Sequence, residues 1–414
     1  MLSRRHFLAG LATAFGALVA ACASTSSPGP TSTASGGATQ PPTPGPTPGP
    51  GSEAPSGSPE PTGTSDATLR RKIGRMLIVG FRGTTLGPTD PFMAALASGA
   101  LGGVILFDRD QLTRTAGRNI TDPAQLAALT GALRAQALHG PIGPELLIAV
   151  DQEGGRVARL NPGNGYPASS SAADLGAQND LERTTDAAIL TAVTLAGAGI
   201  DLNLAPVVDL NLNPTNPAIG ALGRSYSADP DVVIAQATAV IEAEEGAGIR
   251  TAIKHFPGEG SGTGNTDRGI VDVTGTWTDV ELRPFRELTA AGLPSAVMVG
   301  HIINGQFDPG RPAALSRPTV TGLLRGELGW DGVVISDDLQ AAAITQAYGA
   351  DEAVALAIEA GVDLLLFANQ QVYDPDIVAH VGDAVLGFVA SGRITEARLD
   401  ESVARIEGLF NPVE

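Results

Sequence analysis

The sequence is poor in several residue types, and each shortage excludes a class of protein. Among its 414 residues there is one Cys, which rules out a disulfide framework and a cysteine-rich zinc site. The five His residues form no HExxH pair, so we expect no metal. Lys and Arg number 26 against 44 acidic residues, and a net charge of −18 argues against nucleic-acid binding.

Residues 1–22 have the features of an export signal. Arg4 and Arg5 precede an apolar run that is too short to span a membrane. The segment SRRHFL at 3–8 resembles a twin-arginine signal, which directs export of folded proteins. The run ends in VAAC, which resembles a bacterial lipobox. We therefore expect acylation of Cys22, the only cysteine of the chain.

Residues 23–66 form a second segment with its own composition. Of these 44 residues, 36 are Pro, Gly, Ser or Thr. No hydrophobic core can be built from such a composition, which is typical of a disordered tether. We expect an exported protein, lipid-anchored through Cys22 to the outer face of the cytoplasmic membrane, with the tether carrying residues 67–414.

Residues 67–414 alternate short apolar runs with amphipathic, Ala-rich helical segments. Eight apolar runs predict strands at 77–81, 103–107, 146–150, 201–207, 251–256, 296–301, 333–336 and 363–367. Alternation indicates parallel β/α units, and eight units predict a single (β/α)8 barrel. A doubly wound sheet is the alternative. No dinucleotide or phosphate-loop motif follows any of these strands, so we expect no cofactor.

Polar residues follow the predicted strands one after another. They are Asp108, Asp151, Asp209, Lys254, His255, His301, Asp337, Asp338 and Asn369. In a barrel, all of them converge on the mouth where active sites lie. Lys254 is one of only two lysines in the chain, and its compact ammonium is suited to donate to hydroxyls or to balance a carboxylate.

Five segments in this order and spacing resemble glycoside hydrolase family 3. They are AVDQEGGRVARL, NLAPVVDLN, GRSYS, IKHFPGEG and VVISDDL. The resemblance is to the single-barrel bacterial β-N-acetylglucosaminidases (β-N-acetylhexosaminidases) and covers nearly all of residues 67–414. It implies hydrolysis of a glycoside with retention, which needs an ionised carboxylate on one face of the sugar and a proton donor for the leaving oxygen.

The resemblance also implies roles for individual residues. Asp337, the first aspartate of SDDL, is implied to be the nucleophile that forms a covalent glycosyl-enzyme. Residues expected to bind the terminal sugar are Asp151, Arg159, Arg224, Lys254, His255 and His301. Asp338 is expected to be structural, because adjacent side chains on a strand point to opposite faces.

The sequence departs from the family pattern at the proton donor. The relatives usually carry Asp-Ser-His after KHFPG, whereas Asn-Thr-Asp stands at 265–267 here and no His lies between His255 and His301. Asp267 is therefore the candidate acid/base, and Glu259 is a weaker candidate. Four glycines at 258–264 predict a mobile loop that closes over substrate.

The resulting hypothesis is a monomeric exo-β-glycosidase that removes terminal β-N-acetylglucosamine from cell-wall-derived saccharides or muropeptides. An aromatic content of 4% favours a small pocket for one terminal sugar. The missing histidine leaves two alternatives. One is a catalytically impaired saccharide-binding lipoprotein, and the other is a glycosidase or phosphorylase for a different sugar.

Overall fold

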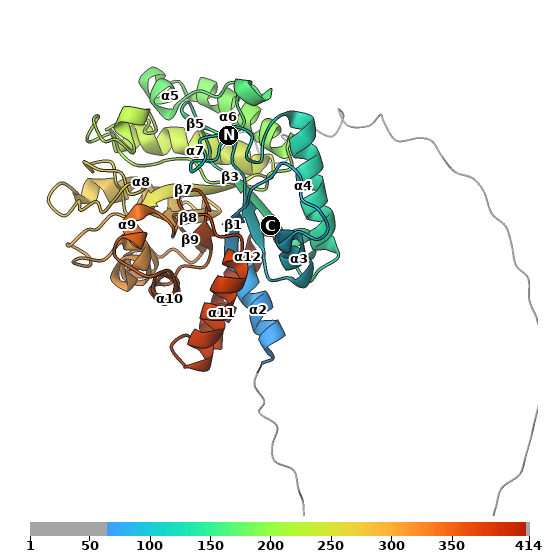
Figure 1. Cartoon of the computed structure of the whole chain (residues 1–414). Helices are drawn as coiled ribbons and strands as arrows, with labels where there is room; N and C mark the ends of the chain where they lie inside the picture. Colours follow the sequence, from blue (N-terminus) through green and yellow to red (C-terminus); the bar gives the residue numbers. More distant parts are fainter. Residues whose placement is uncertain (1–63, 411–414) are drawn as a thin grey trace, which may run out of the picture. The chain divides into compact units, whose positions relative to one another are not determined.

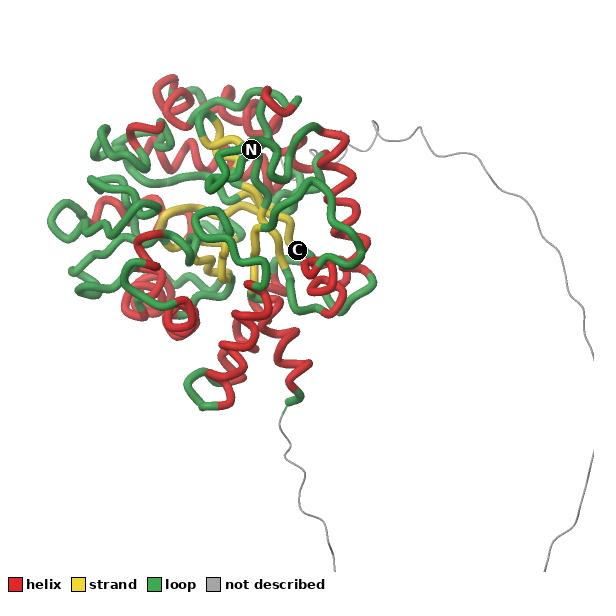
Figure 2. The backbone as a smooth tube through the Cα atoms, in the orientation of Figure 1, coloured by secondary structure: helices red, strands yellow, loops and turns green. Residues whose placement is uncertain are grey.

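The computed structural model describes residues 64–410 (Figures 1 and 2). The predicted export signal, Cys22 and most of the predicted tether lie outside this range. Asp66, which we assigned to the tether, is the first residue of the first described helix, α2 (Asp66–Arg75). Ser65 is its N-cap and accepts a hydrogen bond from the Thr68 N–H, and Thr64 donates to Glu396.

Eight parallel strands form one sheet, in the order β10-β1-β2-β3-β6-β7-β8-β9. Their bounds are β1 Leu77–Gly80, β2 Gly103–Ile105, β3 Leu147–Val150, β6 Leu202–Asn203, β7 Arg250–Phe256, β8 Ala296–Val299, β9 Val333–Ser336 and β10 Leu365–Phe367. A parallel bridge between Ile335 and Leu364 brings β9 to the start of β10 and nearly closes the ring. The predicted (β/α)8 barrel is confirmed.

The helices surround the strands (Figure 2). The α-helices are α2 Asp66–Arg75, α3 Pro91–Ser98, α4 Pro123–Leu138, α5 Ala172–Gln178, α6 Leu181–Gly197, α7 Pro230–Gly246, α8 Arg283–Ala290, α9 Ala342–Thr345, α10 Ala350–Ala360, α11 Ile377–Ala390 and α12 Glu396–Gly408. Single turns lie at η1 Gly143–Glu145, η2 Pro162–Asn164, η3 Gly220–Leu222, η4 Asp279–Leu282 and η5 Ala313–Leu315, and a π-helix, η6, spans Pro318–Glu327. No described helix is long and apolar enough to cross a membrane.

Local chemistry explains where these elements begin. All four residues of β1, β3, β8 and β9 are buried, as strands covered by helices on the outside and by side chains within the barrel must be. Asp122 and Asp229 cap helices α4 and α7, each followed by a proline at the first helical position. The first and last described helices lie side by side, since α2 packs on α11 and α12 (Figure 1).

All eight predicted strands are present, although the fourth along the chain is shorter than expected. The run predicted at 201–207 contains only a two-residue strand, β6, because the chain then turns into the loop that carries Asp209. An additional antiparallel hairpin, β4 Gln152–Gly154 and β5 Val157–Ala158, follows β3 and was not predicted. This hairpin presents the DQEGGR segment at the mouth of the barrel.

Candidate active site

The site is built where the strands end. Asp151 follows β3, and Asp337 follows β9. Lys254 and His255 lie near the carboxyl end of β7. His301 comes two residues after β8. Because all the strands are parallel, these side chains meet at one end of the barrel, as predicted.

Lys254 lies between two carboxylates. Its Nζ is 2.7 Å from Asp151 Oδ1 and 2.7 Å from Glu153 Oε1, and its side chain is 2% exposed. Burial by itself would lower the pKa of Lys254, but the two carboxylates outweigh it and the net direction is up. The ammonium therefore stays charged inside the protein, where it can donate to a sugar hydroxyl.

Arg224 extends this network from the loop between η3 and α7. Its Nε and Nη2 each lie 2.7 Å from a Glu153 oxygen, in a bidentate pair. Burial opposes the charge on Glu153, but Arg224 and Lys254 hold its pKa well below the usual range. Arg159 reaches Asp151 Oδ2 at 3.5 Å. The structure thus brings four of the predicted sugar-binding residues together in one cluster.

Glu153 was missed as a site residue. It stands two positions after Asp151, and residues two apart in an extended chain share a face. That spacing was the available signal. Glu153 is more buried than Asp151, and it is the counter-charge that lets two cations, Lys254 and Arg224, lie in the same cluster.

His255 joins the cluster to a buried aspartate. Its Nε2 lies 3.2 Å from Arg224 Nη2, and its Nδ1 lies 2.7 Å from Asp209 Oδ2. Because a guanidinium can only donate, Nε2 accepts and Nδ1–H donates to Asp209 in neutral His255. Burial would lower the pKa of His255, but Glu259 and Asp209 raise it overall.

Glu259, the weaker acid/base candidate, is buried beside this pair. Its Oε1 is 3.6 Å from His255 Nδ1, and it is 5% exposed. Burial raises the pKa of Glu259 to about 7, with Asp209 adding to the rise and His255 opposing it. The pKa suits proton transfer at neutral pH, but a buried carboxyl packed on His255 and Asp209 is poorly placed to reach a leaving group at the mouth.

One group of described residues has the ligand types and spacing for a metal ion. Ligand atoms of Asp209, His255 and Glu259 all lie within 4.8 Å of one another. Both ring nitrogens of His255 are already hydrogen-bonded, and both Asp209 oxygens accept N–H donors. His255 and Asp209 are thus satisfied by protein groups, and the expected absence of a metal stays a prediction.

Asp337 is a half-buried carboxylate at the end of β9. Its Oδ1 accepts a hydrogen bond of 2.8 Å from the Asp338 N–H. Burial would raise its pKa, but His301, His255, this N–H and Lys254 together lower it. Burial holds the pKa of His301 below its usual value, whereas the pKa values of His255 and Lys254 are raised, so these two groups supply positive charge toward Asp337. Asp337 is therefore ionised, as a nucleophile must be.

Asp338 and His301 support the segment around Asp337. Asp338 is buried and its Oδ1 accepts the N–H groups of Gln340 and Ala368, which clamps the ends of β9 and β10 together. Burial raises the pKa of Asp338 to about 7. His301 Nε2 donates to the Asp338 carbonyl at 2.9 Å, and its Nδ1 has no partner among the described residues. The structural role expected for Asp338 agrees with these contacts.

The loop after β7 is held more tightly than its glycines suggest. Residues 258–262 are buried, and Glu259, Gly260 and Gly262 each offer a carbonyl to Asn213 or Asn216. A Cβ on Gly260 would lie 1.7 Å from the Leu210 carbonyl oxygen. The predicted mobility is therefore wrong for this half of the loop, where glycine serves close packing of two backbones.

The second half of the loop returns Asp267 to the segment after Asp337. The Thr266 carbonyl accepts a hydrogen bond of 3.0 Å from the Ala343 N–H, at the start of α9. Asp267 itself is exposed, and its Oδ1 accepts from Gln371 Nε2 at 3.0 Å in a hydrogen bond at the surface of the protein. Removal of water by the surrounding loops raises its pKa, and the like charge of Asp337 raises it further.

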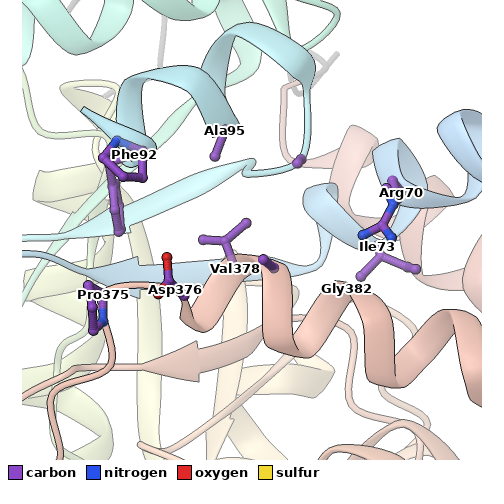
Figure 3. A pocket seen from close by; sticks show the side chains of 11 residues that line it. Arg70, Ile73, Phe92, Ala95, Pro375, Asp376, Val378 and Gly382 are labelled. Carbon is purple, nitrogen blue, oxygen red and sulfur yellow. The ribbon is translucent and has the colours of Figure 1, made fainter. Parts of the chain in front are cut away.

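A separate apolar cavity lies on the outside of the barrel (Figure 3). It has a volume of about 170 Å³ and lies between α2, α3 and α11. Ile73, Phe92 and Val378 line it, together with Arg70 and the start of α11. None of the predicted site residues takes part, so this cavity is not the mouth of the barrel.

The comparisons with known proteins place the chain in a family. Residues 68–409 match the model of the glycosyl hydrolase family 3 N-terminal domain. The chain belongs to glycosyl hydrolase family 3. It is 36% identical over 331 residues to a β-hexosaminidase of Xylella fastidiosa strain M23, covering 77% of this chain and 92% of that protein.

Other relatives are longer than this chain. It is 33% identical to β-hexosaminidase A of Pseudoalteromonas piscicida, over 75% of this chain but only 53% of that protein. A solved family 3 β-N-acetylglucosaminidase from Paenibacillus sp. strain FPU-7 is 36% identical with a TM-score of 0.74, over 82% of this chain and 62% of that one. The chain therefore spans about half to two thirds of these two relatives.

Proposed function

We propose that this protein is a retaining exo-β-glycosidase that hydrolyses terminal β-linked N-acetylglucosamine. Ionised Asp337 attacks the anomeric carbon while Asp267 protonates the departing glycosidic oxygen, which gives a covalent glycosyl-enzyme. Asp267 then removes a proton from water, and the water releases the sugar with its configuration retained. No step requires a cofactor.

The observation that carries this proposal is that the pKa values of Asp337 and Asp267 are shifted in opposite directions. The pKa of Asp337 is lowered, whereas that of Asp267 is raised with Asp337 as the like charge acting on it. Two carboxyl groups whose pKa values differ in this way are suited to be a nucleophile and a general acid. Glu259 has a raised pKa too, but it is buried against Asp209 and His255.

The sugar specificity rests on the cation and carboxylate cluster and on the relatives. Asp151 accepts from hydroxyls, while Lys254 and Arg159 donate to hydroxyl oxygens, so that the cluster recognises a ring rich in hydroxyl groups. Proteins named β-hexosaminidase and β-N-acetylglucosaminidase cover most of this chain. Cell-wall saccharides or muropeptides are the proposed source of substrate, and lipid anchoring at Cys22 would place the barrel beside them.

The test uses the full-length chain and two aryl β-N-acetylglucosaminides, one with a dinitrophenyl and one with a methoxyphenyl leaving group. Asp337→Ala should lower turnover of both by about 10⁴-fold. Asp267→Ala should lower turnover of the methoxyphenyl substrate by 10²- to 10⁴-fold and spare the first step with dinitrophenyl, roughly as loss of a general acid does. Azide should then restore turnover and give a β-glycosyl azide.

Other outcomes favour the alternatives. Saccharide binding by calorimetry without turnover that depends on Asp337 would indicate a binding protein, and would refute the proposal. Faster turnover in phosphate, with glycosyl phosphate as the product, would indicate a phosphorylase. The same leaving-group selectivity in Glu259→Gln, with none in Asp267→Ala, would transfer the acid role to Glu259.

A further inference from the structure

The loop that follows β10 is built on buried side-chain amides. Asn369 is 1% exposed, and its Nδ2 donates to the Gly80 carbonyl at 2.9 Å and to the Asp374 carbonyl at 3.0 Å. Its Oδ1 accepts from the Asp374 N–H at 3.1 Å. Every polar atom of this side chain is therefore occupied, which ties the loop to the end of β1.

Gln370 ties the same loop to the segment after β2. It is 3% exposed, and its Oε1 accepts from the Gln111 N–H at 2.9 Å and from Arg118 Nη1 at 3.0 Å. Its Nε2 donates to the Arg109 carbonyl at 2.9 Å. A buried network in which every member is satisfied holds one arrangement, because any shift leaves desolvated groups without partners.

The loop is also joined to the segment of the nucleophile. Gln340, three residues after Asp337, accepts from the Asn369 N–H at 2.7 Å and donates to Asn369 Oδ1 at 3.1 Å. Asp338 accepts from the Ala368 N–H at 3.0 Å. The backbone at 368–369 is thus held by direct hydrogen bonds to the side chains of Asp338 and Gln340, which follow Asp337 in the chain.

Gln371 projects from this rigid base toward the candidate acid. Its Nε2 donates to Asp267 Oδ1 at 3.0 Å, across 104 positions of sequence. We propose that Gln371 is the positioning residue of the general acid, and that it sets which oxygen of Asp267 carries the proton. This inference rests on the role of Asp267 under the proposed function.

The chemistry follows from the direction of the hydrogen bond. An amide N–H can donate to Oδ1 whether the carboxyl is ionised or neutral, as long as Oδ1 bears no proton. If Oδ1 carried the proton, its O–H and the Gln371 N–H would be two donors facing each other with no acceptor between them. The proton of the neutral acid therefore lies on Oδ2, and the direction of Oδ2 is fixed by the chain from Gln371 through the buried amides to Asp337.

Apart from its hydrogen bond with Gln371, Asp267 has a pKa that several titratable or charged groups influence. They are Asp337, Arg224, His301 and His255. None of them belongs to the loop after β10, so a change at Gln371 leaves their charges in place. Loss of an N–H donor disfavours the ionised carboxylate, and the alkaline limb of the kcat/KM profile should therefore move to higher pH in the variant.

The experiment compares Gln371→Met with Gln346→Met in the full-length chain. Gln346 reaches the same loop, but its Nε2 contacts the Arg268 carbonyl at 3.5 Å and not the acid. Gln371→Met should lower kcat/KM by about tenfold for the methoxyphenyl substrate, the equivalent of one net hydrogen bond, and by less than about twofold for dinitrophenyl. In Gln346→Met, any loss should be equal for the two substrates.

A double variant separates this inference from the proposed function. In an Asp267→Ala background, Gln371→Met should cause no further loss with the methoxyphenyl substrate. Three results would overturn the role of Gln371 while leaving that of Asp267 standing. They are an equal loss of kcat/KM on both substrates in Gln371→Met, an alkaline limb of the kcat/KM profile that does not move, and losses that add in the double variant. Absence of leaving-group selectivity in Asp267→Ala itself would overturn both.

Discussion

Replacing Lys254 by Met should destabilise the protein far more than the same change at Lys72. These are the only two lysines of the chain, which makes them a matched pair. Lys254 is 2% exposed and lies between Asp151 and Glu153 at 2.7 Å each. The Lys72 side chain is 22% exposed and pairs with two acidic residues of α12.

The magnitude follows from what the change leaves behind. At an effective dielectric constant of 20, each contact of Lys254 is worth roughly 6 kcal/mol before desolvation. Removing one partner of a buried ion pair costs about 3–5 kcal/mol, because the other charge stays buried. Glu153 keeps Arg224 and Asp151 keeps Arg159, so we expect the lower end, about 3 kcal/mol. For the exposed pair of Lys72 we expect about 0.2–1 kcal/mol.

Calorimetry measures the difference. With an unfolding entropy of about 2.1 cal/mol/K per residue over roughly 350 residues, 3 kcal/mol corresponds to a Tm lower by about 4 °C, against about 1 °C or less for Lys72→Met. Urea unfolding provides an independent free energy. A Lys254→Met variant as stable as the wild type would refute the reasoning, since it would mean that Met fills the site without leaving a charge uncompensated.

The pH dependence of this difference has a defined sign. The raised pKa of Lys254 means that its stabilisation is fully present below its unfolded value near 10.5 and is lost above its folded value. The lowered pKa of Glu153 means that its contribution is present above about 4.3 and is lost on acidification. The Tm difference should therefore be constant from about pH 6 to 9 and shrink below about pH 4.

Two further predictions concern buried positions away from the sugar cluster. Burial raises the pKa of Glu244 to about 8, so Glu244 should contribute a fall in wild-type stability of up to ~1.4 kcal/mol per unit between about pH 5 and 8. Glu244→Gln should remove this contribution and lessen the pH slope of the stability measured by urea unfolding; an unchanged slope would contradict the assignment. Gly260→Ala should lose about 2–3 kcal/mol, because its Cβ meets the Leu210 backbone. Gly246→Ala, at a helical position with open space around it, should unfold at the wild-type urea concentration or slightly above it.

The strands were predictable because their signal is local. A strand buried on both faces must be continuously apolar, and the eight apolar runs coincide with the eight strands of the barrel. The polar residues after those runs were equally predictable, because the carboxyl ends of parallel barrel strands meet at one end of the barrel, where active sites lie. Family motifs then pointed to Asp337 and to the residues around Lys254.

Other features depend on contacts that no local pattern contains. Glycine spacing in the loop after β7 suggested mobility, yet Gly260 is needed because the Leu210 backbone lies against it. The sequence favoured Asp267 over Glu259 as the acid only by spacing, because the burial of Glu259 against His255 exists only in the folded chain.

The sequence by itself determined the barrel and the set of residues at its mouth, because hydrophobic periodicity and strand ends are properties of short segments. Only the tertiary structure decided which of these side chains pair with one another in ion pairs and hydrogen bonds. Glu153 lies between Lys254 and Arg224, and Gln371 reaches Asp267 across 104 positions, through contacts that exist only once the strands have closed into a ring.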